Sequence, residues 1–334
     1  MKVGILTLPF VNNYGGILQN YAMQAAIRKC GMEPITLDVE SPKTPVWIFI
    51  ASWIKSFIFV LFGKKRAFPK TRVNKRSELL NDFIRSSIST TEELKNLNED
   101  ILKKYGVTAV VVGSDQVWRP KYTPDISKMF LDFVKNENTK RIAYAASFGV
   151  DGWEYTPQQT VVCSELAKKF DAISVRESSG VHLCKEYLGA KAIWTLDPTL
   201  LLSKGDYETL CCDIPIENTP FLAAYILEKT DDIKVKCKQI ASERGLTIKW
   251  FTADKAASLS IREWIAMFRD ASYVVTDSFH GTVFSIIFAK EFKCVCNESR
   301  GSARFESLLE LYNTGKLAEM RAFSLNWLKK ALES

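Results

Sequence analysis

Short apolar runs alternate along the chain with longer segments of helical character. The runs have the length of buried strands, and strands that alternate with helices are typical of parallel sheets covered by helices. The first strand, loop, helix and second strand, over residues 2–39, have the order of a Rossmann-type βαβ half. We therefore predict an α/β fold. Strands are expected at 2–8, 35–39, 109–112, 141–145, 172–175, 193–196, 220–226, 247–251, 273–275 and 292–296.

The length of 334 residues is large for a single core and favours two domains. We predict two Rossmann-like domains that face a cleft, the first at 1–205 and the second at 206–320. The segment 203–219 is interpreted as the linker between them, and 321–334 as a closing helix that packs back on the first domain. A helical, basic insertion is expected in the first domain at about 41–105.

Several of the expected strands end in polar residues, at the sheet edge where ligands bind in open α/β sheets. The first of these ends is the loop PFVNNYGG, which lacks the GxGxxG pattern of dinucleotide-binding proteins. It contains Asn13, Tyr14, Gly15 and Gly16 and leads into a helix, whose N-terminus favours anions. An ordinary βα turn explains the same residues.

The stretch ASYVVTDSFHGTVFSIIF, residues 271–288, combines a short strand, a polar turn and a buried helix. Thr276, Asp277 and Ser278 have helix-capping chemistry. His280 follows them and is one of only two histidines in the chain. Lone histidines are often structural, but this position at a strand-to-helix edge makes His280 a candidate for acid–base chemistry.

Three arginines are candidate anion ligands. Arg300 and Arg304 flank a Gly-Ser turn at the start of a helix, where two guanidinium groups would hold a phosphate or carboxylate. Arg176 follows the strand at 172–175. The alternatives are surface charge for the first two and an ion pair with Glu177 for Arg176.

The positive net charge of +7 comes from one segment. Residues 41–77 contain nine lysines and arginines and no acidic residue, and the rest of the chain has 36 basic and 38 acidic residues. Within this segment, 46–62 is almost wholly apolar and rich in aromatic residues. An apolar helix followed by a basic cluster resembles an interfacial anchor for anionic membrane, so peripheral membrane contact through 46–76 is one interpretation. Packing against the protein body or a partner is the other, and no nucleic-acid-binding module surrounds the charge.

The eight cysteines show no CxxC pair and no zinc-like spacing with histidine. This pattern indicates free thiols in a reducing compartment, and no metal site is expected. The first residues enter an apolar strand directly and do not have the form of a signal peptide. We therefore expect a cytoplasmic protein, at the inner face of the membrane if 46–76 binds lipid.

Five stretches resemble the polysaccharide pyruvyl transferase family. They are spread in the expected order from about Lys2 to Leu311 and read NNYGGILQNYAMQ, VVVGSDQVW, ISVRESSG, LDPTLLL and TDSFHGTVFSIIF. The family is similar in architecture to two-domain GT-B glycosyltransferases. Its members move pyruvate from phosphoenolpyruvate onto two hydroxyls of a sugar and form a cyclic ketal.

The resemblance implies an enzyme, a pyruvyl transferase, that uses phosphoenolpyruvate as donor substrate and needs no further cofactor. The acceptor would be a sugar of a surface polysaccharide or a lipid-linked oligosaccharide. His280 would be the general acid that protonates the donor. The donor would be bound by Arg176, Arg300, Arg304, Ser278 and Gly281, and the acceptor by Asn13, Tyr14, Gly15, Gly16, Asp115 and Gln116.

One position departs from the family pattern. Many members have arginine two residues before the histidine, in TDRxHG, where this chain has Ser278. Arg300 or Arg304 is therefore the expected replacement. The alternatives are a nucleotide-sugar glycosyltransferase of the same fold, with Glu298 or Glu306 at the ribose, and a glycan- or membrane-binding scaffold without donor activity.

Overall fold

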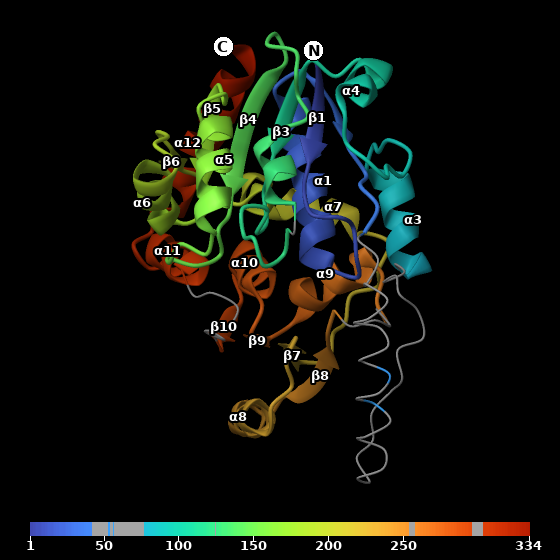
Figure 1. The fold of residues 1–334 in the computed structure, drawn as a ribbon. Helices are drawn as coiled ribbons and strands as arrows, with labels where there is room; N and C mark the ends of the chain where they lie inside the picture. Colours follow the sequence, from blue (N-terminus) through green and yellow to red (C-terminus); the bar gives the residue numbers. More distant parts are fainter. Residues whose placement is uncertain (42–52, 54–55, 57–76, 124, 254–257, 296–302) are drawn as a thin grey trace.

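A computed structural model describes residues 1–41, 53, 56, 77–123, 125–253, 258–295 and 303–334. These residues form two parallel sheets with helices packed around them (Figure 1), which confirms the predicted two-domain α/β fold. The prediction of residues 46–76 as a membrane contact lies outside the described residues, apart from residues 53 and 56. Among the described residues no helix has both the length and the apolar character required to cross a membrane.

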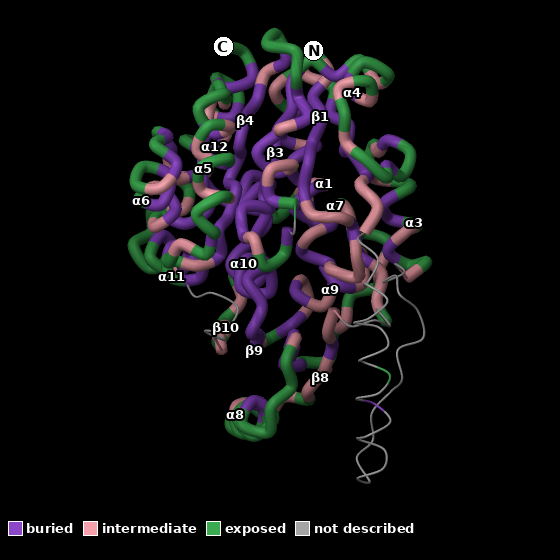
Figure 2. Tube along the Cα trace, viewed as in Figure 1, coloured by how far each residue is buried: buried purple, intermediate pink, exposed green. Residues whose placement is uncertain are grey.

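The first sheet has six parallel strands in the order β2-β1-β3-β4-β5-β6. Its side chains alternate between two layers of core: Val3 and Ile5 of β1 face one layer, and Leu6 faces the other. The strands are short and buried (Figure 2), as expected for a sheet covered on both faces. They are β1 (Lys2–Leu6), β2 (Glu33–Thr36), β3 (Ala109–Val112), β4 (Lys140–Ala146), β5 (Ala172–Val175) and β6 (Ile193–Trp194).

Three helices of this domain begin with conventional side-chain caps. The side chain of Ser77 caps α3, that of Asn98 caps α4, and Thr156 forms a capping box with Gln159 at the start of α5. Helices α3 and α4 belong to the insertion predicted at 41–105. The elements are α1 (Tyr14–Lys29), α3 (Glu78–Ser87), α4 (Glu99–Tyr105), η1 (Ile126–Phe130), α5 (Pro157–Ala167), α6 (Ser178–Tyr187) and η2 (Pro198–Leu201).

The second sheet has four parallel strands in the order β10-β9-β7-β8. Its strands are β7 (Phe221–Tyr225), β8 (Thr247–Phe251), β9 (Tyr273–Thr276) and β10 (Glu291–Cys294). Its helices are α8 (Asp231–Arg244), α9 (Ile261–Asp270), α10 (Phe279–Ile287) and α11 (Ala303–Asn313). Figure 2 shows that α10 is buried along its length, whereas α8 is largely exposed. Helix α10 therefore lies where the two domains meet.

The segment 203–219, predicted as the linker between the domains, contains α7 (Lys204–Leu210) in its first half. Ser203 and Asp206 make a capping box at its start. Tyr207 is fully buried, donates a hydrogen bond to the carbonyl of Thr199 at 2.9 Å and packs edge-on against Phe284 of α10. The segment is therefore a packed connection between the domains.

One hydrophobic core runs through both domains. The ring of Tyr14 on α1 stacks on Trp264 of α9 with centroids 5.5 Å apart, and its hydroxyl donates to the carbonyl of Leu259 at 2.8 Å. Trp264 in turn packs edge-on against Phe284 of α10. Because relative motion of domains is expected unless their interface is large and hydrophobic, this shared core favours a fixed arrangement.

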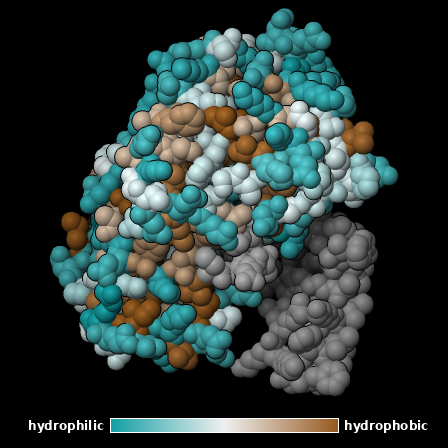
Figure 3. All heavy atoms as spheres, turned by 90° about the vertical axis from the view of Figure 1, so that its left-hand side faces the viewer, coloured by the Kyte–Doolittle hydropathy of each residue, from teal (hydrophilic) through white to brown (hydrophobic). Residues whose placement is uncertain are grey.

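The last helix, α12 (Leu317–Glu333), returns to the first domain and lies against β4 and α1 (Figure 1). The hydroxyl of Ser324 accepts a hydrogen bond from the backbone N–H of Leu196 at 3.0 Å, and Lys140 donates to the carbonyl of Leu332 at 2.9 Å. Figure 3 views the side of the molecule that carries α6 and α11, where hydrophobic side chains form small groups among hydrophilic ones.

Candidate functional site

The carboxyl ends of both sheets meet at a cavity of about 320 Å³. In the first sheet the strand order changes direction between β1 and β3, and in the second between β7 and β9. Loops that follow strands at such switch points are the usual ligand sites of open α/β sheets. All four of these strand ends contribute to the wall. The cavity is lined by Leu8, Asn13, Asp115, Gln116, Tyr122, Leu227, Asp277, Ser278, Phe279, His280 and Arg304.

His280 lies in the first turn of α10, at the strand-to-helix edge that the sequence predicted. The hydroxyl of Ser278 caps this helix by accepting from the N–H of Gly281 at 3.4 Å. The imidazole is held from the other domain by Gly15. A Cβ atom added to Gly15 would lie 2.0 Å from Nδ1 of His280, so only glycine leaves room for the ring. Nε2 of His280 has no hydrogen-bond partner in the described part of the chain.

Asp197, between β6 and η2, is a candidate site residue that sequence reasoning did not single out. It is fully buried, and its Oδ2 accepts from Arg176 Nη1 at 2.9 Å and from Ser114 Oγ at 3.1 Å. The same oxygen lies 3.7 Å from Nε2 of His280. The other oxygen, Oδ1, accepts from the hydroxyl and the N–H of Thr199 at 2.6 and 3.0 Å.

Burial alone would raise the pKa of the Asp197 carboxyl, but His280, Arg176 and Thr199 together hold this pKa well below its usual range. Asp197 is therefore a permanent buried anion that faces His280 across the domain boundary. The available signal was its place in LDPTLLL, where an aspartate follows a strand at the same sheet edge as the other polar strand ends.

Arg176 and Arg304 are brought together on either side of Phe279. Their guanidinium carbons lie 4.8 and 5.5 Å from the centre of that ring. Arg304 lines the cavity, and Arg176 lies behind it beside Asp197. Nε of Arg304, and Nε and Nη2 of Arg176, are buried without a hydrogen-bond partner in the described chain. Such groups carry a large desolvation cost unless a ligand pairs with them.

The electrostatics of the two arginines differ. Burial, and then the neighbouring charge of Arg176, lower the pKa of Arg304 to about 10. Burial also opposes the charge of Arg176, but Asp197, Asp115 and Glu177 outweigh burial and raise its pKa. Arg304 forms no ion pair with the residues that the structure describes, and an anion in the cavity would provide a counter-ion.

On the opposite wall, Asn13 follows β1 and Asp115 follows β3. Asp115 has a positive φ of 51°, and its Oδ1 accepts from the N–H of Gln116 at 2.8 Å. Gln116 lines the cavity but its Oε1 already accepts from Arg119 at 3.1 Å. The side chain of Asn13 does not cap α1, although the residue stands at the N-cap position.

The structure corrects several predicted site residues. Tyr14 is fully buried and bonded to Leu259, so it joins the domains and does not reach an acceptor. The His280 ring occupies the space that a side chain at Gly15 would need. Gly281 packs closely against Thr276 and Tyr225, and a Cβ atom added to it would lie 2.2 Å from the threonine hydroxyl. Neither glycine lines the cavity.

The remaining predicted residues divide as follows. Gly16 lies beside the cavity in a smaller pocket that shares Asn13 and Asp115 with it. Arg300 and Glu298 lie outside the described residues. Glu306, the other residue considered for a nucleotide ribose, is exposed on α11 and does not line the cavity.

Comparison with solved structures finds weak similarity over nearly the whole chain. UDP-GlcNAc 2-epimerase from Neisseria meningitidis is 10% identical over 99% of both chains, with a TM-score of 0.47. A glycosyltransferase from Rickettsia africae is 10% identical over 97% of this chain and 92% of that chain, with a TM-score of 0.43. At these TM-scores the similarities carry no argument about this chain.

Among curated proteins, no relative matches the sequence. A sequence model of one family, described as polysaccharide pyruvyl transferase, matches residues 13–297. The match spans most of the chain and includes Asn13 and the loops after β3 and β9 that line the cavity, together with Asp197 and His280. The chain therefore belongs to the polysaccharide pyruvyl transferase family.

Proposed function

We propose that this protein transfers pyruvate from phosphoenolpyruvate to two hydroxyls of one sugar, in a surface polysaccharide or its lipid-linked precursor, and forms a cyclic ketal. One observation carries the proposal. Arg304 presents a buried, unpartnered guanidinium nitrogen at a cavity that also contains the start of α10 and His280, and Arg176 lies behind this cavity with unpartnered nitrogens of its own among the described residues. A small anion with a carboxylate and a phosphate matches this concentration of donors.

In this proposal the donor lies on the side of α10 and Arg304. Ser278, Phe279 and His280, at the N-terminus of α10, all line the cavity. Arg304 then supplies the cation that other family members are expected to carry at position 278. The guanidinium comes from α11 and reaches the same cavity, so Ser278 is left to cap α10.

The reaction assigned to this geometry starts when His280 gives a proton to C3 of the donor, whose double-bond electrons form the new C–H bond. C2 becomes electrophilic, and the first sugar hydroxyl attacks it and loses a proton. The C2–O bond to phosphate then breaks, and the second hydroxyl attacks C2 and closes the ring. Of the two hydroxyl protons, one restores His280 and the other leaves with phosphate. Nε2 of His280, which has no partner within the described chain, is the assigned proton donor.

The test is incubation of the purified protein with phosphoenolpyruvate and candidate glycans. Release of inorganic phosphate, together with a new ketal methyl signal in the NMR spectrum of the glycan, is the expected result. The same glycans are incubated in parallel with nucleotide sugars. Turnover of a nucleotide sugar, with no phosphate released from phosphoenolpyruvate, would replace this proposal with the glycosyltransferase alternative.

The variant His280→Ala distinguishes an enzyme from a binding scaffold without donor activity. We expect the rate of phosphate release to fall by at least about a hundredfold, since general acid catalysis contributes roughly 10²–10⁴. Circular dichroism and the unfolding midpoint check that the variant is folded. A folded variant with the wild-type rate would remove His280 from the mechanism.

A further inference from the structure

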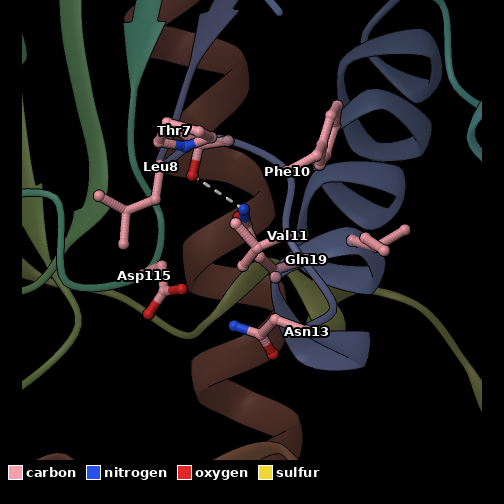
Figure 4. A pocket seen from close by; sticks show the side chains of 10 residues that line it. Thr7, Leu8, Phe10, Val11, Asn13, Gln19 and Asp115 are labelled. Carbon is pink, nitrogen blue, oxygen red and sulfur yellow. Dashed lines mark hydrogen bonds between the residues drawn. The ribbon is translucent and has the colours of Figure 1, made fainter. Parts of the chain in front are cut away.

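A small pocket of about 50 Å³ opens beside the main cavity, between the loop after β1 and the first turns of α1 (Figure 4). It shares Leu8, Asn13 and Asp115 with the main cavity, so the two adjoin. A water site needs roughly 10–15 Å³ on this scale, so the pocket fits a group of about three or four heavy atoms and excludes a sugar ring. Its lining residues are Thr7, Leu8, Pro9, Phe10, Val11, Asn13, Gly16, Ile17, Gln19 and Asp115.

The inner wall of this pocket is apolar or already satisfied. Leu8, Val11 and Ile17 present hydrocarbon. Gln19 is the one long polar side chain on the inner wall, and both ends of its amide are in use. Its Nε2 donates to the hydroxyl of Thr7 at 3.0 Å, and its Oε1 accepts from the N–H of Ser114 at 3.2 Å. The wall is therefore better suited to a methyl group than to a hydroxyl.

The mouth of the pocket has the opposite character. Figure 4 shows Asn13 and Asp115 on two sides of the mouth, with their polar ends turned toward one another. The Asn13 amide makes no hydrogen bond to any described residue, although its backbone N–H does. Asp115 uses Oδ1 for the N–H of Gln116, and the nearest ion-pair partner of that oxygen is 3.7 Å away. One free donor and one free acceptor thus flank an apolar hole.

We propose that this pocket binds the acetamido group of the acceptor sugar, so that the acceptor is an N-acetylated amino sugar. The methyl group enters the apolar hole, the carbonyl accepts from the Asn13 amide, and the N–H donates to Asp115. This inference rests on the proposed function, since it names the class of acceptor for the same site. A hexose hydroxyl at this position would leave the hole unfilled and the Asn13 amide without its acceptor.

The probes are methyl glycosides of N-acetylglucosamine, N-acetylmannosamine and N-acetylgalactosamine, each compared with its hexose counterpart. The first readout is kcat/KM for phosphate release from phosphoenolpyruvate. We expect at least one acetamido glycoside to exceed its hexose counterpart by roughly tenfold to a hundredfold. Val11→Phe, which fills the hole, and Asn13→Ala, which removes the donor, should each bring this ratio close to one.

Val161→Phe is the matched control, because Val161 is exposed on α5 and far from the pocket lining. This variant should keep the wild-type ratio. Equal turnover of both sugars in all three pairs, or an equal loss for both sugars in Val11→Phe and Asn13→Ala, would overturn the proposal.

A second readout does not depend on the reaction. Saturation-transfer NMR with the glycosides alone should give the strongest signal at the acetyl methyl group in wild type and a weakened one in Val11→Phe. If no glycan releases phosphate, the proposed function fails, and this measurement still decides the pocket. Methyl signals no stronger than the ring-proton signals for all three acetamido glycosides would overturn the acetamido assignment.

Discussion

Gly15→Ala tests whether the two domains place His280 by direct contact. The added Cβ would lie 2.0 Å from Nδ1 and 2.3 Å from Cγ of the imidazole, whereas ordinary van der Waals contact begins at 3.4 Å. The ring or the helix must therefore move by about 1.4 Å, which is the difference between 3.4 and 2.0 Å. A misplacement of about 1 Å at a reacting group costs on the order of 100-fold in rate. Crowding in a packed interface costs a further ~1–3 kcal/mol of folding free energy.

Two measurements separate these effects. Phosphate release from phosphoenolpyruvate gives kcat and KM, and urea unfolding gives the free energy of unfolding. The chain has only two histidines, and His182 is exposed, so the imidazole NMR signals report directly on His280. We expect kcat to fall about a hundredfold, with a shifted His280 signal and an unchanged His182 signal.

Gly152→Ala is the matched control, because no atom lies within 4 Å of a Cβ at that position and its backbone is not left-handed. It should behave as wild type. If Gly15→Ala kept the wild-type kcat and the wild-type His280 signal, the contact would not position the imidazole, and the reasoning would be refuted.

Three further predictions follow. Arg304→Gln should raise KM for phosphoenolpyruvate by roughly 10- to 100-fold, since hydrogen bonds to charged groups contribute ~1.5–3 kcal/mol; Arg304→Lys should recover part of the loss, and Arg262→Gln, at an exposed ion pair with Asp213, should change nothing. Asp197→Asn should lower the free energy of unfolding in urea at pH 7 by ~3–5 kcal/mol, because it leaves the buried Arg176 without its anion. Because the pKa of Asp197 is lowered in the folded state, its stabilisation is present above the unfolded pKa of about 4, and the difference between wild type and Asp197→Asn should shrink as the pH falls below that value; a constant difference would contradict the pKa shift. Tyr14→Phe should lower the free energy of unfolding by ~0.5–1.5 kcal/mol, because the hydrogen bond to Leu259 is lost, and should leave kcat unchanged. A large loss of kcat would instead indicate that Tyr14 contacts the acceptor.

The sheet edges were predictable from sequence because strand-to-loop transitions leave a local signal. Apolar runs that end in polar residues placed Asn13, Asp115 and His280 at the carboxyl ends of parallel strands, and the structure brings these three residues to one cavity. All ten expected strands are present, with ends that differ by up to three residues. The capping chemistry predicted at 276–278 is also found, since Ser278 is the N-cap of α10.

The roles of individual residues depend on contacts between distant segments, which a local pattern does not contain. Tyr14 looked like a polar loop residue, but Trp264, 250 positions later, turns it into core. Asp197 was not singled out in the sequence, because its buried contacts are with Arg176 and His280, which belong to different domains. In both cases the deciding partner is fixed by the packing of the two domains.

Helix α12 has a consequence for how the protein is made. It covers β4 of the first sheet, yet it follows the whole second sheet in the chain. During synthesis one face of the first domain therefore stays uncovered until residues beyond 316 have emerged. Until then the backbone N–H of Leu196, next to Asp197, also lacks its hydrogen bond to Ser324. We expect the second domain to finish folding first and the strand end that carries Asp197 to be secured last. A ribosome-bound chain that stops before α12 should accordingly be open to proteolysis in the first domain, although almost all of that domain has been synthesised.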